Sequence, residues 1–208
     1  MLAPVITLIL YFLQPGGALI DAADPANGAA TIAAMVGNPG LGKVTSVLIP
    51  LGLLAMVFGV YVLQANIRAS GNGDALSRLG ALFFLVAVIG WMVSSGVSLA
   101  ITGSDLPAQQ AAQIYGSLYA TTVGIGTIAG LAGGIGFLAL ALAISTRDDS
   151  NKIAALVVAV ASVVAIVVTV IGAVDTTTLE TMSLITGITY IITVIWFFTL
   201  GLNLSKVE

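Results

Sequence analysis

Residues 153–174 read IAALVVAVASVVAIVVTVIGAV and contain no charged side chain. An α-helix rises about 1.5 Å per residue, so about 20 apolar residues cross the roughly 30 Å hydrocarbon core of a bilayer. In lipid, the Val and Ile residues are no obstacle to a helix, because a helix satisfies its backbone polar groups internally. The stretch therefore predicts a membrane-spanning helix, and the rest of the chain repeats its pattern.

Five further apolar stretches of similar length lie on either side, at residues 2–20, 44–64, 79–101, 118–144 and 182–202. Every charged residue falls outside the six stretches. Hydrophobic residues make up 59% of the chain and charged residues 7%, whereas a soluble domain has about 45–50% and 25%. We therefore predict one all-α transmembrane domain over residues 1–208, a polytopic helical bundle with about six transmembrane helices and no separate soluble domain.

The stretch at residues 2–20 is the weakest of the six. It is interrupted by residues that disfavour an apolar helix, namely Pro4, Gln14, Pro15, Gly16 and Gly17. It fits either a short first span or the core of a signal peptide. A signal peptide opens with a positively charged segment, but the first Lys or Arg is Lys43. We therefore expect a retained span.

The long gap at residues 21–43 contains a short apolar segment. Pro25 is expected to open a helix that continues to Val36, and the sequence Gly-Asn-Pro-Gly at residues 37–40 is expected to end it. Such a helix fits either a position along the membrane surface or a loop packed on the ends of the spans. Further along, Pro50 is expected to bend the second span.

The basic residues give a threading direction. Five of the six Lys and Arg residues lie in alternate gaps, at Arg68, Arg78, Arg147, Lys152 and Lys206. Only Lys43 falls on the other side. Because loops rich in Lys and Arg stay in the cytoplasm, we expect a multi-pass protein of the cell membrane with both termini cytoplasmic. Removal of residues 2–20 would leave the orientation of the other five spans unchanged, with a new N-terminus on the outer side.

The fourth stretch carries a glycine-rich segment, GIGTIAGLAGGIG at residues 124–136. Gly126, Gly130 and Gly134 recur every fourth residue and therefore share one helical face, where another helix can approach closely. A dinucleotide-binding motif has a different spacing and follows a strand. We predict that these three glycines form a helix-packing surface.

A polar stripe with helical spacing marks the sixth stretch, at Thr186, Thr189, Tyr190 and Thr193. It fits two interpretations. The side chains could line a cavity for a polar solute, or the hydroxyls could bond to carbonyls of their own helix and to neighbouring helices. The second interpretation is the more common one in membrane helices, and we favour it.

The chain has no His and no Cys. Ion-coupled transporters and proton relays place ionisable groups inside the bundle, and these spans contain none. The acidic residues of the predicted outer loops have no motif spacing and are interpreted as solvated; they are Asp21, Asp24, Asp105, Asp175 and Glu180. We therefore expect no enzyme, and we nominate no catalytic residue, cofactor ligand or metal ligand.

The expected function is that of a structural or accessory subunit in a larger membrane protein complex, such as a membrane-bound multi-subunit enzyme whose ligands lie on other chains. The expected partners are membrane lipid and other integral membrane subunits or a second copy of the chain. Nucleic acid is not expected, because no run of basic residues could neutralise phosphates. The alternatives are a carrier or channel for a neutral or lipophilic solute and, last, an enzyme acting on lipid through loop carboxylates.

Four segments carry a resemblance to a known family. They are an Asp-Pro followed by an Ala-rich helix at residues 24–36, IPLGLLA at residues 49–55, SRLGA at residues 77–81 and GGIGF at residues 133–137. In this order they resemble a family of bacterial and archaeal membrane proteins, known as a domain of unknown function, with about six spans. The resemblance implies a fold and no activity.

Overall fold

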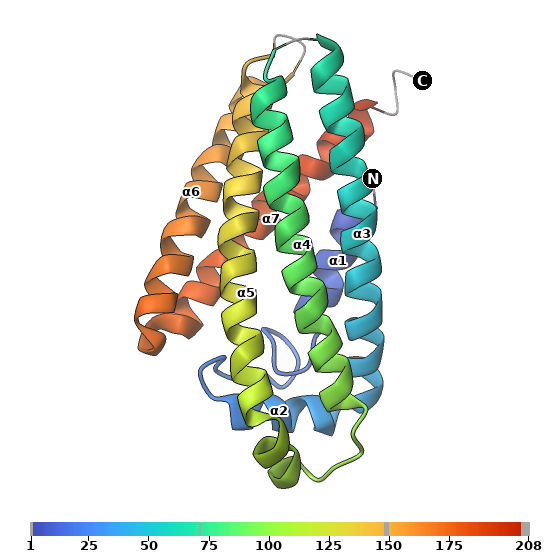
Figure 1. Ribbon diagram of the computed structural model, residues 1–208, viewed down its shortest axis with the longest axis vertical. Coiled ribbons are helices and arrows are strands. Elements are labelled where there is room, and N and C mark those ends of the chain that lie inside the picture. Colours follow the sequence, from blue (N-terminus) through green and yellow to red (C-terminus); the bar gives the residue numbers. More distant parts are fainter. Residues whose placement is uncertain (1, 71, 148–149, 205–208) are drawn as a thin grey trace.

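The computed structural model describes residues 2–70, 72–147 and 150–204. These residues form helices, with no β-structure beyond one isolated bridge between Pro15 and Ile20 (Figure 1). In chain order the elements are α1 Ala3–Phe12, α2 Gly28–Gly37, α3 Pro39–Ser70, α4 Asp74–Thr102, α5 Ala108–Ser145, α6 Lys152–Val174, the short 3-10 helix η1 Thr176–Thr178 and α7 Leu179–Leu204.

Five of these helices, α3 to α7, are long and apolar enough to cross a membrane. The all-helical, multi-pass membrane class is therefore confirmed, but the count of six spans is not. Residues 2–20 contain only the ten-residue helix α1, which is about 15 Å long and covers half of a hydrocarbon core. Pro15 cannot extend the helix, and Gly16 turns the chain with a positive φ of 77°.

The helices pack around α5, which contacts α4 on one side, α6 on another and α2 near its beginning. In Figure 1, α3, α4 and α5 stand side by side, whereas α7 crosses behind them from the lower end of α6 towards the upper end of α3. Helix α1 packs against α3 and α7. It thus fills the space between α3 and the lower half of the oblique α7.

The backbones of α4 and α5 approach each other closely at Gly80 and Gly136. A Cβ atom at Gly80 would lie 2.9 Å from the carbonyl oxygen of Gly136, and one at Gly136 would lie 2.9 Å from the backbone nitrogen of Phe84. Both distances are shorter than a carbon atom tolerates, so only glycine fits at either position. The two backbones therefore touch, in the manner of small-residue contacts in membrane helices.

Helix α2 lies across the lower end of the bundle instead of along it (Figure 1). It begins at Gly28, three residues after Pro25, because the Asn27 side chain caps it by accepting a hydrogen bond from the Ala30 N–H at 3.1 Å. Its fully buried Ile32 packs in a cluster with Ile101 of α4. Helix α2 is therefore anchored on the ends of the long helices.

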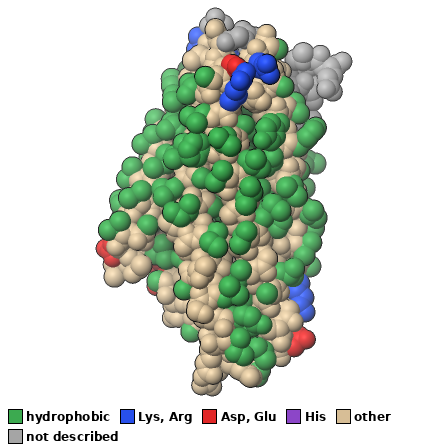
Figure 2. All heavy atoms as spheres, in the orientation of Figure 1, with side chains coloured by type: hydrophobic (Ala, Val, Ile, Leu, Met, Phe, Trp, Pro, Cys, Tyr) green, Lys and Arg blue, Asp and Glu red, His purple; other side chains and the backbone are tan. Residues whose placement is uncertain are grey.

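Charged side chains gather at the two ends of the bundle, and apolar side chains cover the surface between them (Figure 2). At one end, Arg78 pairs with Asp74 at 2.8 Å. On the flanks, large apolar residues such as Phe58 and Ile153 are exposed over 73% and 77% of their surface. A water-soluble monomer does not expose contiguous apolar surface on this scale, so the exterior suits lipid.

Replacing Gly136 with Leu is expected to destabilise the protein, because the new side chain would meet the backbone of α4 instead of a movable side chain. Overpacking costs about 1–3 kcal/mol, and more where nothing can move aside. Thermal unfolding in detergent measures the change. The control is Gly59→Leu, since a Cβ at Gly59 meets no atom within 4 Å. Equal shifts in the two variants would contradict the backbone contact.

Candidate functional site

The polar stripe of α7 faces the bundle. Thr189 and Thr193 are buried, with 5% and 3% of their surface exposed. The hydroxyls of Thr186, Thr189 and Thr193 donate to the carbonyls of Met182, Thr186 and Thr189 at 2.9, 2.7 and 2.9 Å. Each threonine hydroxyl therefore has its hydrogen-bond acceptor within α7 itself.

Tyr190, the fourth member of the stripe, packs among aromatic rings of other helices. Its ring meets Trp91 of α4 edge to face at a centroid distance of 6.0 Å and Phe137 of α5 at 6.3 Å. Phe137 also contacts Phe84 at 5.3 Å and Phe197 at 5.7 Å. Aromatic side chains thus connect α7 to α4 and α5, which gives the stripe a packing role.

Two grooves of the described residues lie away from this stripe. One, of about 370 Å³, opens between α2 and the start of α5. A second, of about 330 Å³, is a shallow apolar depression on α6 between Ile153 and Val160. Neither is lined by Thr186, Thr189, Tyr190 or Thr193. These contacts support the interpretation that the stripe packs helices, and the cavity for a solute stays a prediction.

The predicted glycine surface of α5 divides into two parts. Gly130 and Gly134 lie under α6, where their Cβ atoms would lie 3.6 Å from Thr169 and 2.7 Å from Ile166. A Cβ at Gly126 would meet nothing within 4 Å. Gly126 lies one turn before Gly130 in α5, which places it level with the last turn of α6. Helix α6 ends there, at Val174.

Two packing glycines of α5 were missed in the sequence. A Cβ at Gly133 would lie 2.9 Å from the Trp91 ring of α4, and Gly136 contacts the α4 backbone. Gly133 and Gly136 are three residues apart and lie on the α5 face next to the predicted one. Their spacing was visible in the sequence, but a segment with glycines on several faces does not tell which face meets which helix.

Below the end of α6, one face of α5 consists of small residues. Ala112, Gly116, Ala120 and Gly124 recur every fourth residue, and we call them the α5 small-residue face. Ala120 and Gly124 are exposed, and Cβ atoms at Gly116 and Gly124 would meet nothing within 4 Å. The sequence alone could not mark this face, because its exposure depends on where the other helices lie.

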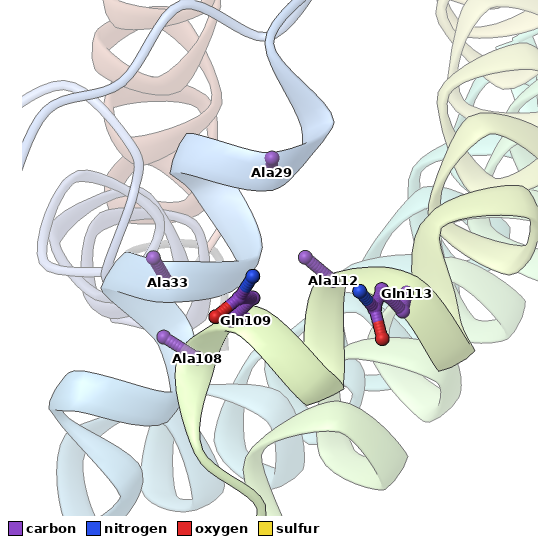
Figure 3. A pocket seen from close by; sticks show the side chains of 6 residues that line it. All are labelled: Ala29, Ala33, Ala108, Gln109, Ala112 and Gln113. Carbon is purple, nitrogen blue, oxygen red and sulfur yellow. The ribbon is translucent and has the colours of Figure 1, made fainter.

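The groove between α2 and α5 adjoins this face. It is lined by Ala29, Ala33, Ala108, Gln109, Ala112 and Gln113. Figure 3 shows the alanines on the facing sides of the two helices, with Gln109 and Gln113 beside them. Because Ala112 belongs to both, the groove and the small-residue face form one continuous surface.

Polar contacts hold the loop that precedes α2. The Tyr119 hydroxyl donates to the carbonyl of Pro25 at 3.4 Å. The Asn38 amide donates to the carboxylate of Asp21, and Asp24 accepts from the Ala26 N–H at 2.8 Å. Within the described part of the chain, no group of three or more His, Cys, Asp or Glu could hold a metal ion. Asp21 and Asp24 therefore act as hydrogen-bond acceptors within this loop.

Comparison of the chain with family models, with curated proteins and with solved structures gave no match. The functional argument therefore rests on the geometry of the described helices. In that geometry, Ala120 and Gly124 of the α5 small-residue face are exposed beside the groove, and none of the described helices covers these two residues.

The packing role of the stripe predicts small effects when its polar groups are removed. Thr193→Val and Tyr190→Phe keep the side-chain shapes, so each should change the free energy of unfolding by less than about 1 kcal/mol. Phe137→Ala, which empties the centre of the aromatic cluster, should cost about 3–5 kcal/mol. Thermal unfolding of the three variants in detergent provides the comparison. If Thr193→Val lowered the stability as much as Phe137→Ala does, the packing role of the stripe would be overturned.

Proposed function

We propose that this chain is a non-catalytic accessory subunit of a larger complex in the cell membrane, and that it binds a neighbouring integral membrane subunit through the α5 small-residue face. The observation that carries the proposal is the exposure of Ala120 and Gly124 beside the groove of α2 and α5. A membrane-bound multi-subunit enzyme is one setting, with the reacting groups on other chains.

The physics of helix association in lipid supports this role. Lipid tails are as apolar as Leu side chains, so burial of apolar surface does not drive association, and close van der Waals packing does. Small residues allow that packing because two backbones can approach each other. Within the chain, α4 and α5 pack closely in this way at Gly80 and Gly136. The α5 small-residue face would allow the same close packing with a helix of a partner.

The distribution of charge supports a passive role in the membrane. Charged side chains lie outside the six apolar stretches, whereas proton relays and ion-coupled transporters retain ionisable groups inside. The Thr hydroxyls of α7 bond within their own helix. A subunit that contributes packing surface needs neither a relay nor a catalytic group.

We also propose an orientation, with the α3–α4 and α5–α6 turns in the cytoplasm and α2 on the outer side. Arg68, Arg78, Arg147 and Lys152 lie near these two turns, and the preference of Lys and Arg for cytoplasmic loops supports this direction. A sixth crossing at residues 2–20, with both termini cytoplasmic, stays a prediction. The helix of this segment, α1, is about 15 Å long.

The partner surface is tested by Gly124→Leu. The added side chain should block close helix approach and reduce copurification of integral membrane partners in mild detergent about tenfold, which corresponds to about 1.4 kcal/mol. The unfolding midpoint should not change, because a Cβ at Gly124 has free space. Gly59→Leu, at an exposed glycine of α3, is the matched control and should keep the partners. Purification of the wild-type chain as a monomer without partners would refute the subunit role.

The orientation is tested with single cysteines, because the chain has none of its own. Asp105→Cys, in the turn between α4 and α5, should react with a membrane-impermeant maleimide in intact cells. Asn72→Cys, in the turn between α3 and α4, should react only after permeabilisation. The reverse pattern would invert the threading. Leu2→Cys tests the sixth crossing. If residues 2–20 cross the membrane, a cysteine at residue 2 should react only after permeabilisation.

A further inference from the structure

Hydroxyl side chains are concentrated where the beginning of α3 packs against the end of α4. Gly42 of α3 lies against Thr102 of α4, whose Cβ would be 3.2 Å from a Cβ at Gly42. The two helices run antiparallel, so one turn further along each places Ser46 opposite Ser98. Ser46 and Ser98 are buried, with 4% and 6% of their surface exposed, and so is Ser95 at 7%. We call Ser46, Ser95 and Ser98 the α3–α4 serine seam.

The threonines of this region and Ser46 differ in their hydrogen bonds. The Thr45 hydroxyl donates to the Leu41 carbonyl at 2.9 Å, and the Thr102 hydroxyl donates to the Ser98 carbonyl at 2.9 Å. By contrast, the Ser46 hydroxyl is buried and has no hydrogen-bond partner among the described residues. A buried polar group without a partner is unfavourable, and more so in a membrane protein, where water is scarce.

Pro50 adds a second unpaired group at the same place. In a helix, the N–H of residue 50 would donate to the carbonyl of Ser46, but proline has no N–H. The Ser46 carbonyl therefore loses its usual donor. Ser46 presents both a hydroxyl and a carbonyl that need partners, one turn before Pro50 and opposite the serines of α4.

We propose that the α3–α4 serine seam binds one ordered water molecule. The water donates to the Ser46 carbonyl and to the Ser98 hydroxyl across the seam, and it accepts from the Ser46 hydroxyl. Buried waters typically make about three such bonds, and ordered water commonly satisfies the backbone groups that a proline frees in a membrane helix. The water joins α3 to α4 where Pro50 weakens α3.

A double-mutant cycle tests the shared water. Ser46→Ala and Ser98→Ala each remove a ligand of the same water, so each should lower the unfolding midpoint by about 2–4 °C. The double variant should lower it no further than the larger single change, because the water is already lost. Ser162→Ala is the control for removing a buried hydroxyl bonded within its own helix. Additive shifts would show that Ser46 and Ser98 do not share a water, and a midpoint that rises or stays the same in Ser46→Ala would show that the Ser46 hydroxyl binds none.

Radiolytic footprinting locates the water directly, because hydroxyl radicals formed from a bound water label the adjacent side chains. Ile49, one turn from Ser46, and Leu63, further along α3, are equally buried at 7%. Ile49 should be labelled several-fold more than Leu63 in the wild-type protein, and Ser46→Ala should remove the difference. Equal labelling of Ile49 and Leu63 in the wild-type protein would overturn the proposal.

Discussion

The contact of the α4 and α5 backbones at Gly80 and Gly136 determines how the other helices pack. In lipid, helices associate by close packing and not by the hydrophobic effect, and α4 and α5 form the most extensive helix contact of the described residues. Gly134 receives α6 on another face of α5, and α2 closes on the lower end. A side chain at Gly80 or Gly136 would separate α4 from α5 and, with them, the surfaces on which α2, α3 and α6 are packed.

Helix α7 packs against the bundle in a different way. Its main contacts are with α6 and α1, and it crosses α4 and α5 obliquely (Figure 1). Large rings bridge the remaining distance, with Phe137 contacting both Tyr190 and Phe197. Towards the beginning of α7, the distance between α7 and α3 grows. A short helix is enough to fill the space between them. The ten residues of α1 match that space, with Phe12 packed 3.8 Å from the position of a Cβ at Gly187.

Local patterns predicted the helical class and the multi-pass character, because both follow from the composition and length of single segments. Residues 153–174 were expected to be a helix, and α6 spans Lys152–Val174. Residues 2–20 differ, since Pro15 and Gly16 end α1 early. The residues that pack around a given side chain come from other helices, so they cannot be read from its own segment. The different surroundings of Gly126 and Gly130, the rings around Tyr190 and the exposure of Gly124 all depend on where other helices lie, which no spacing within one segment determines.

Helix α5 has 38 residues and α6 has 23, so α5 is about 20 Å longer. The excess lies at its beginning, where α2 is attached. A continuous helix is stiff, so this end moves as a lever with the part of α5 in the bundle. A tilt of about 10° would displace its tip by roughly 4 Å. A protein that holds the tip would therefore sense or fix the angle of the whole bundle in the bilayer, without any contact near Gly80 and Gly136.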